Sequence, residues 1–196
     1  MTSLDSRTTR ASARRQDLLD QLVALVLADG FADVTLDELA RRLRCSKSTL
    51  YGLAASKEQL VVAAVKRFFQ RATASVEQRI TEPADHRERI SAYLLAVAEQ
   101  LQPASAAFFA DVAAFAPARE IYERNTRSAA ARVQQLVADG VAAGTVRPVH
   151  APFVGAAVAS VMAAIHRGDI TAATGLDDAA AYRELAGLVS AGIAPR

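Results

Sequence analysis

Apolar residues recur at every third or fourth position along most of the chain, which is the period of helices buried along one face. Residues 16–30 show this pattern most fully, because Leu18, Leu22 and Val26 share one face and Gly30 follows as a stop signal. No segment has the strict alternation of apolar and polar residues that indicates a half-buried strand. The pattern predicts an all-α protein.

Prolines and glycines divide the remaining apolar pattern into separate helices. Pro103 and Pro117 separate neighbouring segments, and Gly140 marks the end of another. About nine helices are expected, over residues 16–30, 35–43, 46–53, 56–80, 87–101, 104–115, 118–140, 153–168 and 176–192.

Two of these helices are too short to stand alone, because isolated helices below about 12–15 residues are marginal in water. Thr35, with Glu38 three residues later, has the signature of a capping box. Ser46 can cap the second short helix, with Leu50 and Leu53 turned inward. Both must pack on the first helix. Two short helices joined by a three-residue turn predict a helix-turn-helix, whose second helix enters the major groove of DNA.

Composition excludes several other classes of protein. Hydrophobic residues make up 52% and charged residues 22% of the 196 residues, which is a globular composition. No uncharged apolar stretch is long enough to cross a bilayer, and the N-terminus lacks the apolar core of a secretory signal, so cytoplasmic residence is expected. Cys45 is the single cysteine, so neither a disulfide framework nor a zinc cluster is expected. We expect no metal and no cofactor.

The net charge of +2 says little about partners, but the charge is unevenly distributed. Residues 1–13 are predicted to form a mobile basic arm, residues 14–57 the helix-turn-helix domain, and residues 58–196 a domain for effector binding and dimerisation. One group of basic residues lies in and just after the arm, and a second precedes the second short helix; alternatively, such groups are solvated helix faces. The two groups are Arg7, Arg10, Arg14 and Arg15, then Arg41, Arg42, Arg44 and Lys47.

The segment "GFADVTLDELARRLRCSKSTLYGLAASKEQLVVAAV" resembles the DNA-binding part of the TetR (tetracycline repressor) family of transcriptional regulators. The shared features are a glycine ahead of a Thr-capped helix, a small turn, a Thr-Leu-Tyr recognition helix, and Ser-Lys-Glu at the start of a fourth helix. The matching residues within this segment are Gly30, Phe31, Thr35, Ala40, Ser46, Thr49, Leu50, Tyr51, Ser56, Lys57, Glu58 and Leu60.

The resemblance implies a role for each residue of the predicted DNA-binding surface. Thr35 and Thr49 would bind phosphates, Tyr51 would contact the DNA backbone or a base edge, and Lys57 would meet a phosphate. A core position for Tyr51 and a solvated one for Lys57 stay open as alternatives. The expected DNA-binding set is Thr35, Arg44, Ser46, Lys47, Ser48, Thr49, Tyr51, Gly52 and Lys57.

This chain departs from the family's pattern in three places. Arg44 stands at the turn position that is often Gly, so it must carry any positive φ at an energetic cost. Leu53 and Ala54 follow where a His or Tyr and then a Phe are common, so a phosphate donor and a packing aromatic are missing. Our hypothesis is that the arginine-rich arm makes up part of this loss through contacts in the minor groove.

The C-terminal part of the chain is too apolar for its helices to be exposed to solvent on all sides. The resemblance implies that its last two helices pair with their copies in a second subunit, which would place two recognition helices on the half-sites of a palindrome. Internal core is the alternative for part of this surface. The expected interface residues are Val154, Val158, Val161, Ile165, Leu185, Leu188 and Val189.

The middle helices are expected to enclose a pocket for a small-molecule effector, because ligand binding in this family changes the spacing of the two recognition helices. An aromatic residue at helical spacing is also compatible with plain core. The candidate pocket residues are Tyr93, Phe108, Phe109, Phe115, Tyr122, Arg132, Gln135, Met162 and His166.

The expected function is a DNA-binding transcriptional regulator, more often a repressor in this family, that binds a palindromic operator as a homodimer and is released by an unidentified effector. An enzyme is disfavoured, because no phosphate loop, nucleophile elbow or metal-binding helix is present and the three histidines have no triad partners. A helical ligand-binding or scaffold protein with a degenerate helix-turn-helix remains the alternative.

Overall fold

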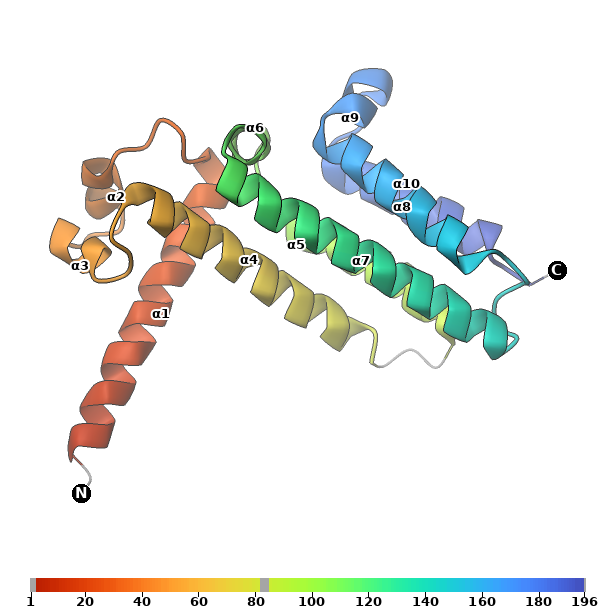
Figure 1. Ribbon diagram of the computed structural model, residues 1–196, viewed down its shortest axis with the longest axis horizontal. Helices are drawn as coiled ribbons and strands as arrows, with labels where there is room; N and C mark the ends of the chain where they lie inside the picture. Colours follow the sequence, from red (N-terminus) through yellow and green to blue (C-terminus); the bar gives the residue numbers. More distant parts are fainter. Residues whose placement is uncertain (1–2, 82–84, 196) are drawn as a thin grey trace. The chain divides into compact units, whose positions relative to one another are not determined.

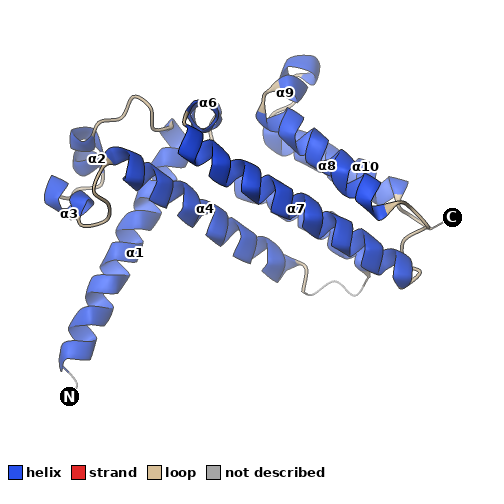
Figure 2. Cartoon of the chain, in the orientation of Figure 1, coloured by secondary structure: helices blue, strands red, loops and turns tan. Residues whose placement is uncertain are grey.

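The computed structural model describes residues 3–81 and 85–195; of residues 3–11 only the helical backbone is described. All regular structure in these ranges is α-helical, which confirms the predicted fold class (Figure 1; Figure 2). The helices are α1 (Ser3–Asp29), α2 (Leu36–Arg42), α3 (Lys47–Tyr51), α4 (Lys57–Arg79), α5 (His86–Leu101), α6 (Ala106–Ala114), α7 (Ala116–Ala142), α8 (Ala151–His166), α9 (Asp169–Thr174) and α10 (Asp178–Gly192).

The described ranges thus hold ten helices where about nine were predicted, and α9 is the additional one. It is six residues long and has no buried residue, so it shows no apolar period in the sequence. Gly168 and Gly175 bound it with φ angles of +77° and +76°. Glycine adopts this left-handed conformation without a steric penalty, so both ends of the short helix are set by the backbone.

The predicted arm begins differently from the expectation. Residues from Ser3 onward are helical and continuous with α1, so no break in the backbone separates the arm from the domain at residue 13. The side chains of Arg7 and Arg10 lie outside the described residues. The mobility of the arm stays a prediction.

The chain divides into two compact units. The first comprises the described residues up to Gln70 together with Pro103–Ile121, and the second comprises Arg71–Gln102 and the residues from Tyr122 onward. The helices α4 and α7 each begin in the first unit and end in the second. The sequence-based boundary at residue 57 coincides with the start of α4 rather than with the edge of a unit.

The core of the first unit is built by the apolar faces of α1, α2, α3 and α4. Leu22 of α1, Leu50 of α3 and Leu60 of α4 are each fully buried, and Leu39 of α2 is nearly so. Burial of a leucine side chain contributes about 1.5–3 kcal/mol. The two short helices are therefore held by their packing, as their length requires.

The segment between α1 and α2 is fastened to α6 within this first unit. Asp111 Oδ2 accepts hydrogen bonds from the backbone N–H groups of Phe31 and Ala32 at 2.5 and 2.8 Å. Gly30 beside them has φ +78°, and a Cβ there would lie 2.5 Å from Asp111 Oδ2. The chain can turn here only because residue 30 has no side chain.

In the second unit, α10 packs along α5. It also lies beside α8 (Figure 1). Its fully buried side chains include Leu94 of α5, Val133 of α7 and Tyr182 of α10. The helix α8 approaches α7 closely at Gly155, where a Cβ would lie 2.9 Å from Gln134 Cβ. Within the described ranges, no helix is both apolar enough and long enough to cross a membrane.

Candidate functional site

The short helix α3 is held by a side-chain cap at its N-terminus and by its fully buried leucine. Ser46 caps its N-terminus by accepting a hydrogen bond from the backbone N–H of Thr49 at 3.1 Å. The Ser46 hydroxyl also lies 2.7 Å from that of Ser48 and 2.8 Å from that of Thr49. With Leu50 anchored in the core, the three hydroxyl groups form a fixed polar cluster at the start of the helix.

The opposite face of α3 lies in solvent, as a DNA-reading helix requires. Lys47, Ser48, Thr49 and Gly52 are exposed, and Tyr51 keeps 51% of its surface accessible. The alternative of a buried core tyrosine at this position is therefore wrong. Exposed hydroxyl, phenol and ammonium groups on one short helix supply donors for phosphate oxygens and base edges.

The preceding helix α2 adds a second exposed N-terminus to the same surface. Thr35 accepts a hydrogen bond from the backbone N–H of Glu38 at 3.2 Å, as the capping signature predicts. The Glu38 carboxylate, however, binds Arg41 at 3.1 and 2.5 Å instead of reaching back to residue 35. This hydrogen bond with Arg41 lowers the pKa of Glu38. Of the predicted capping box, the hydrogen bond to the Thr35 side chain is present, while the Glu38 side chain binds Arg41.

Two lysines of the predicted DNA-binding set already have partners in the protein. Lys57 Nζ donates to the backbone carbonyl of Ala32 at 2.7 Å, and Lys57 is half-buried. Lys47 Nζ lies 2.7 Å from Asp37 Oδ1, which raises the pKa of Lys47. The alternative of a solvated lysine at residue 57 is not decided by this contact. The role of Lys57 as a phosphate contact stays a prediction.

Arg44 occupies the turn between α2 and α3 with φ +50°, and it alone among the described residues other than glycine has a positive φ. This matches the conformation expected where related chains often carry Gly. Its side chain is exposed. A left-handed backbone costs a residue with a Cβ roughly 1–2 kcal/mol.

Replacing Arg44 by glycine is therefore expected to raise the free energy of unfolding by about 1 kcal/mol, since glycine removes the steric penalty. The same replacement at Arg41, inside α2, should instead lower it by about 1 kcal/mol, because glycine weakens a helix interior. Urea unfolding of both variants measures the difference. A loss of stability in Arg44→Gly would show that the Arg44 side chain stabilises the turn by more than its strain costs.

Cys45 sits in the same turn and is half-buried. Burial raises the pKa of its thiol. A reactive cysteine needs a lowered pKa, so this environment does not favour reactivity of the thiol.

Comparison with known proteins agrees with this geometry. The sequence profile described as "Bacterial regulatory proteins, tetR family" matches residues 18–64, which span α2, α3 and most of α1's buried face. Residues 18–64 therefore carry the DNA-binding segment typical of the TetR family. No curated protein is detectably similar to it in sequence.

Solved structures show that the TetR-family fold extends beyond the matched segment. A putative transcriptional regulator from Saccharomonospora viridis, solved in complex with choline, has a TM-score of 0.75 at 17% identity and covers 94% of this chain and 100% of its own. A TetR transcription regulator from Haloarcula marismortui has a TM-score of 0.75 at 15% identity, over 94% and 100%. The ketosteroid regulator KstR2 of Mycobacterium tuberculosis has a TM-score of 0.61 at 19% identity, over 93% and 96%.

The predicted pocket residues fall into two groups. Phe108, Phe109 and Phe115 belong to the first unit, where Phe108 is buried and its ring lies 6.1 Å from that of Phe68 and 6.5 Å from that of Phe31. The other six belong to the second unit. For Phe108, the structure therefore supports the core alternative.

Two polar candidates for the pocket are engaged elsewhere. Arg132 forms a bidentate ion pair with Glu77, and both N–O distances are 2.9 Å. Gln135 donates to Asp139 at 2.8 Å and is exposed. Both therefore have protein partners, and each keeps further N–H donors.

Two of the remaining candidates, Tyr122 of α7 and His166 of α8, form a polar cluster with Tyr182 of α10. Tyr182 is fully buried, and the other two are half-buried. The Tyr182 hydroxyl lies 3.1 Å from His166 Nε2, and the Tyr122 ring packs edge-on against His166 with a centroid distance of 4.4 Å. Burial lowers the pKa of His166 to about 3, so the imidazole is neutral at neutral pH. Burial also raises the pKa of the candidate Tyr93 to about 12. Met162 is buried on α8, one turn before His166.

Sequence reasoning missed Tyr182, which is fully buried. Its position in the pattern, one turn before Leu185 on the same helical face, was the available signal, but nothing in the sequence pairs it with His166. Among the described residues, no three His, Cys, Asp or Glu side chains are grouped closely enough to hold a metal ion.

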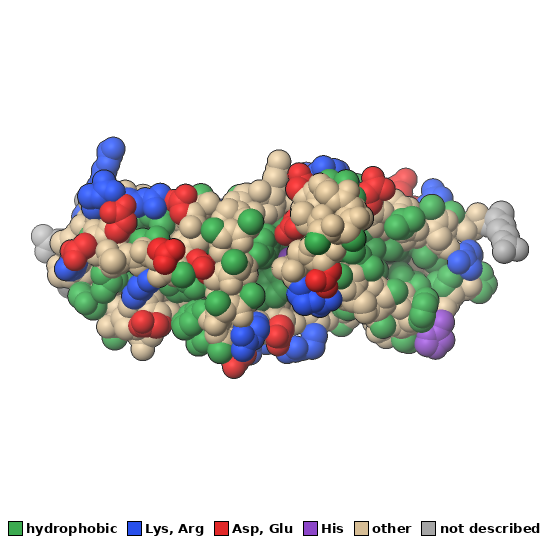
Figure 3. Space-filling view, turned by 90° about the horizontal axis from the view of Figure 1, so that it is seen from above, with side chains coloured by type: hydrophobic (Ala, Val, Ile, Leu, Met, Phe, Trp, Pro, Cys, Tyr) green, Lys and Arg blue, Asp and Glu red, His purple; other side chains and the backbone are tan. Residues whose placement is uncertain are grey.

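The predicted interface residues on α8 and α10 divide between core and surface. Val158, Ile165 and Leu185 are buried inside the second unit, so the core alternative applies to them. Val154, Val161 and Val189 are half-buried, and Leu188 is 72% exposed. Hydrophobic side chains lie at the surface over this pair of helices (Figure 3).

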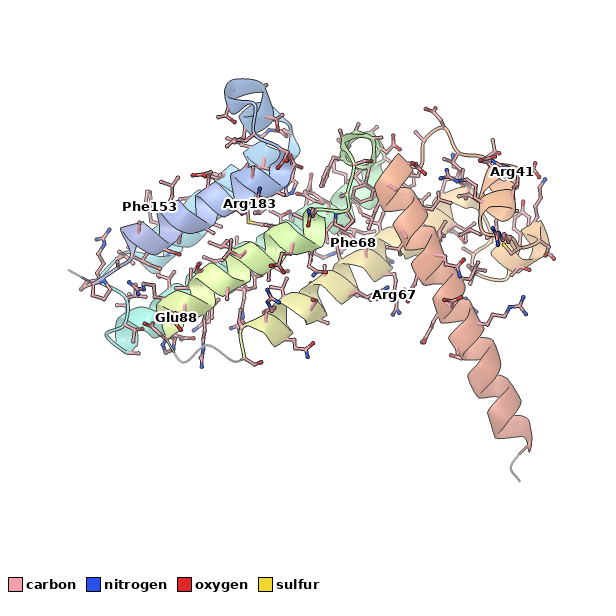
Figure 4. All side chains as sticks on the ribbon, turned by 180° about the vertical axis from the view of Figure 1, so that it is seen from behind. Arg41, Arg67, Phe68, Glu88, Phe153 and Arg183 are labelled. Atoms are coloured by element: carbon pink, nitrogen blue, oxygen red, sulfur yellow. The ribbon has the colours of Figure 1, made fainter. Side chains whose placement is uncertain are left out.

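A groove of about 410 Å³ runs between α8 and α10 and is lined almost wholly by apolar side chains, including Val154, Val161 and Val189. Phe153, which the sequence reasoning did not select, also lines the groove and is 70% exposed (Figure 4). Its place one residue before Val154, on the far side of the helix from Val158, was the signal available in the sequence.

Proposed function

We propose that this TetR-family regulator represses transcription by binding a palindromic operator as a homodimer, and that a small-molecule effector releases it. The observation that carries this proposal is the placement of α3, with Leu50 fixed in the core while Lys47, Ser48, Thr49 and Tyr51 lie in solvent. A two-fold pair of such helices reads two half-sites, and palindromic operators mirror that symmetry.

Repeated selection of duplexes from a random-sequence pool by the purified protein tests the DNA-binding part. We expect enrichment of an inverted repeat. The alternative is a scaffold with a degenerate helix-turn-helix. It is favoured by Leu53 and Ala54, which depart from the family's pattern, and by the partners that Lys47 and Lys57 already have in Asp37 and the Ala32 carbonyl. A pool that shows no enriched motif after several rounds would support that alternative.

The homodimer is supported by the apolar groove between α8 and α10. Large exposed side chains such as Phe153 and Leu188 are unusual on a helix pair facing water, and such patches mark interaction sites. A second copy offers the same apolar surface, so the contact would be self-complementary about a two-fold axis.

Substituting aspartate for Phe153 or Leu188 is expected to convert the dimer to a monomer at micromolar concentration, because burying a carboxylate in an apolar contact costs several kcal/mol. Sedimentation equilibrium measures the mass. Leu95→Asp is a matched control, because Leu95 is an exposed leucine of α5 outside the groove. Dimers that persist in both the Phe153 and the Leu188 variants would assign the interface to another surface.

The effector site is proposed at the cluster of Tyr122, His166 and Tyr182. An apolar aromatic setting with a few placed polar atoms is typical of ligand sites. The fold is compatible with a small ligand, since the Saccharomonospora viridis neighbour was crystallised with choline. To release an operator, an effector must favour the DNA-incompetent state by a few kcal/mol.

A further inference from the structure

The cations around the recognition helix are mostly occupied by acceptors of the protein itself. Residues 36–57 carry five Lys and Arg side chains, all within the described part of the chain. Four of them have a carboxylate or carbonyl partner: Arg41 with Glu38, Arg42 with Asp29, Lys47 with Asp37, and Lys57 with the carbonyl of Ala32. Arg44 has no such partner among the described residues. On a surface that only attracts phosphates, these cations would be expected to lack partners in the protein.

The pair of Lys47 and Asp37 is the one that lies on the recognition helix itself. It joins the first turn of α2 to the first residue of α3, with Nζ and Oδ1 2.7 Å apart. The Asp37 side chain is 75% exposed and that of Lys47 is 51% exposed. An exposed ion pair contributes about 0–1 kcal/mol to stability, so folding does not depend on this one. Its position, beside Ser48 and one turn from Tyr51, matters more for binding than for the fold.

A free lysine at this place would strengthen binding to any DNA. Lysine is a flexible point charge that contacts phosphates readily, and each phosphate neutralised releases counterions regardless of sequence. Asp37 changes this in two ways. Its carboxylate competes with phosphates for Nζ, and its negative charge repels the DNA backbone nearby.

The ammonium group of Lys47 nevertheless keeps two further N–H donors while it holds Asp37. These donors can reach acceptors on a base edge, such as O6 and N7 of guanine, without breaking the ion pair. The carboxylate thus fixes the direction of the lysine and leaves its remaining hydrogen bonds for a base.

We propose that Asp37 is a specificity-determining residue, which holds Lys47 toward a base edge and withholds it from the phosphates. Asp37 acts through Lys47, so it is a positioning residue. This inference rests on the proposed function, since it needs the α3 surface to meet DNA.

The test compares Asp37→Asn with the unaltered protein on two probes: a random-sequence duplex, and the palindrome enriched by selection. On the random duplex, the affinity is expected to rise about eightfold per subunit at 0.1 M salt, and the slope of log affinity against log salt to steepen by about 0.9 per subunit, as one freed phosphate contact predicts. The ratio of palindrome to random-duplex affinity should fall by roughly the same factor.

Two further variants separate the positioning role from a change in net charge. Asp33→Asn removes an exposed carboxylate from the segment just before α2, with no recorded contact to Lys47, and should leave the slope and the ratio nearly unchanged. In the Asp37→Asn/Lys47→Ala double variant, the gain on random duplex should disappear, because the freed cation is absent.

Equal gains in Asp33→Asn, or a gain that survives in the double variant, would overturn the inference in favour of general charge repulsion. An unchanged ratio of palindrome to random-duplex affinity in Asp37→Asn would also overturn the inference. The proposed function would still stand in that case, because the unaltered protein would still have selected a palindrome. Failure of the unaltered protein to bind either probe would overturn both. Thermal melting of each variant confirms that the fold is retained.

Discussion

Alanine at both Thr49 and Tyr51 is expected to lower the affinity for the enriched palindrome by at least about 100-fold, because each lost contact to DNA is worth about 1–3 kcal/mol and the loss occurs at both half-sites. Melting should change little, since both side chains are exposed and the N-cap hydrogen bond uses the backbone of Thr49. An electrophoretic mobility shift gives the affinity and a thermal melt gives the stability.

Leu50→Ala is the matched contrast on the same helix. Leu50 is fully buried, so its truncation should lower the free energy of unfolding by about 2–5 kcal/mol and weaken DNA binding through the loss of folded α3. The Thr49 and Tyr51 double variant differs in losing binding at nearly unchanged stability. Wild-type affinity in that variant would remove the recognition role of α3.

Acidification from pH 7.5 to pH 5 is expected to lower the free energy of unfolding by about 2 kcal/mol through His166 alone. Burial holds its pKa at about 3 in the folded protein, against about 6.5 in the unfolded chain. Between these values the unfolded chain binds the additional proton. The contribution of His166 is therefore fully present above about pH 6.5 and is lost as the pH falls toward 3.

Urea unfolding of the unaltered protein and of His166→Gln at both pH values isolates this contribution, because the surface carboxylates titrate alike in the two proteins. Glutamine keeps a hydrogen-bonding partner for the Tyr182 hydroxyl but has no titrating proton. The glutamine variant should lose about 2 kcal/mol less than the unaltered protein. Equal losses would mean that His166 is protonated without penalty in the folded state.

The helix-turn-helix could be predicted because its determinants are local. Thr35 and Ser46 predict helix starts, because their side chains can cap the N-terminus of a helix. Leu39 and Leu50 predict the buried sides of the two short helices. The positive φ at Arg44 was equally local, since the turn demands it whatever residue stands there.

Contacts between distant residues left no such trace in the sequence. Asp37 and Lys47 are ten positions apart, and Lys57 binds a carbonyl 25 positions earlier, so no periodic pattern relates them. Apolar periodicity also does not tell whether an apolar side chain packs inside its own unit or lies at the surface. Val158 and Ile165 are buried while Phe153 is exposed, although all three are apolar residues of α8. The packing of α8 against α7 and α10 decides which side is covered.

The two amide groups held by Asp111 have a mechanical consequence. Because one carboxylate oxygen accepts hydrogen bonds from two successive peptide units, the loop ahead of α2 is coupled to α6. N–H···O hydrogen bonds span about 2.7–3.2 Å, so these two can absorb only a small displacement of α6. A larger displacement must move the loop or break both hydrogen bonds.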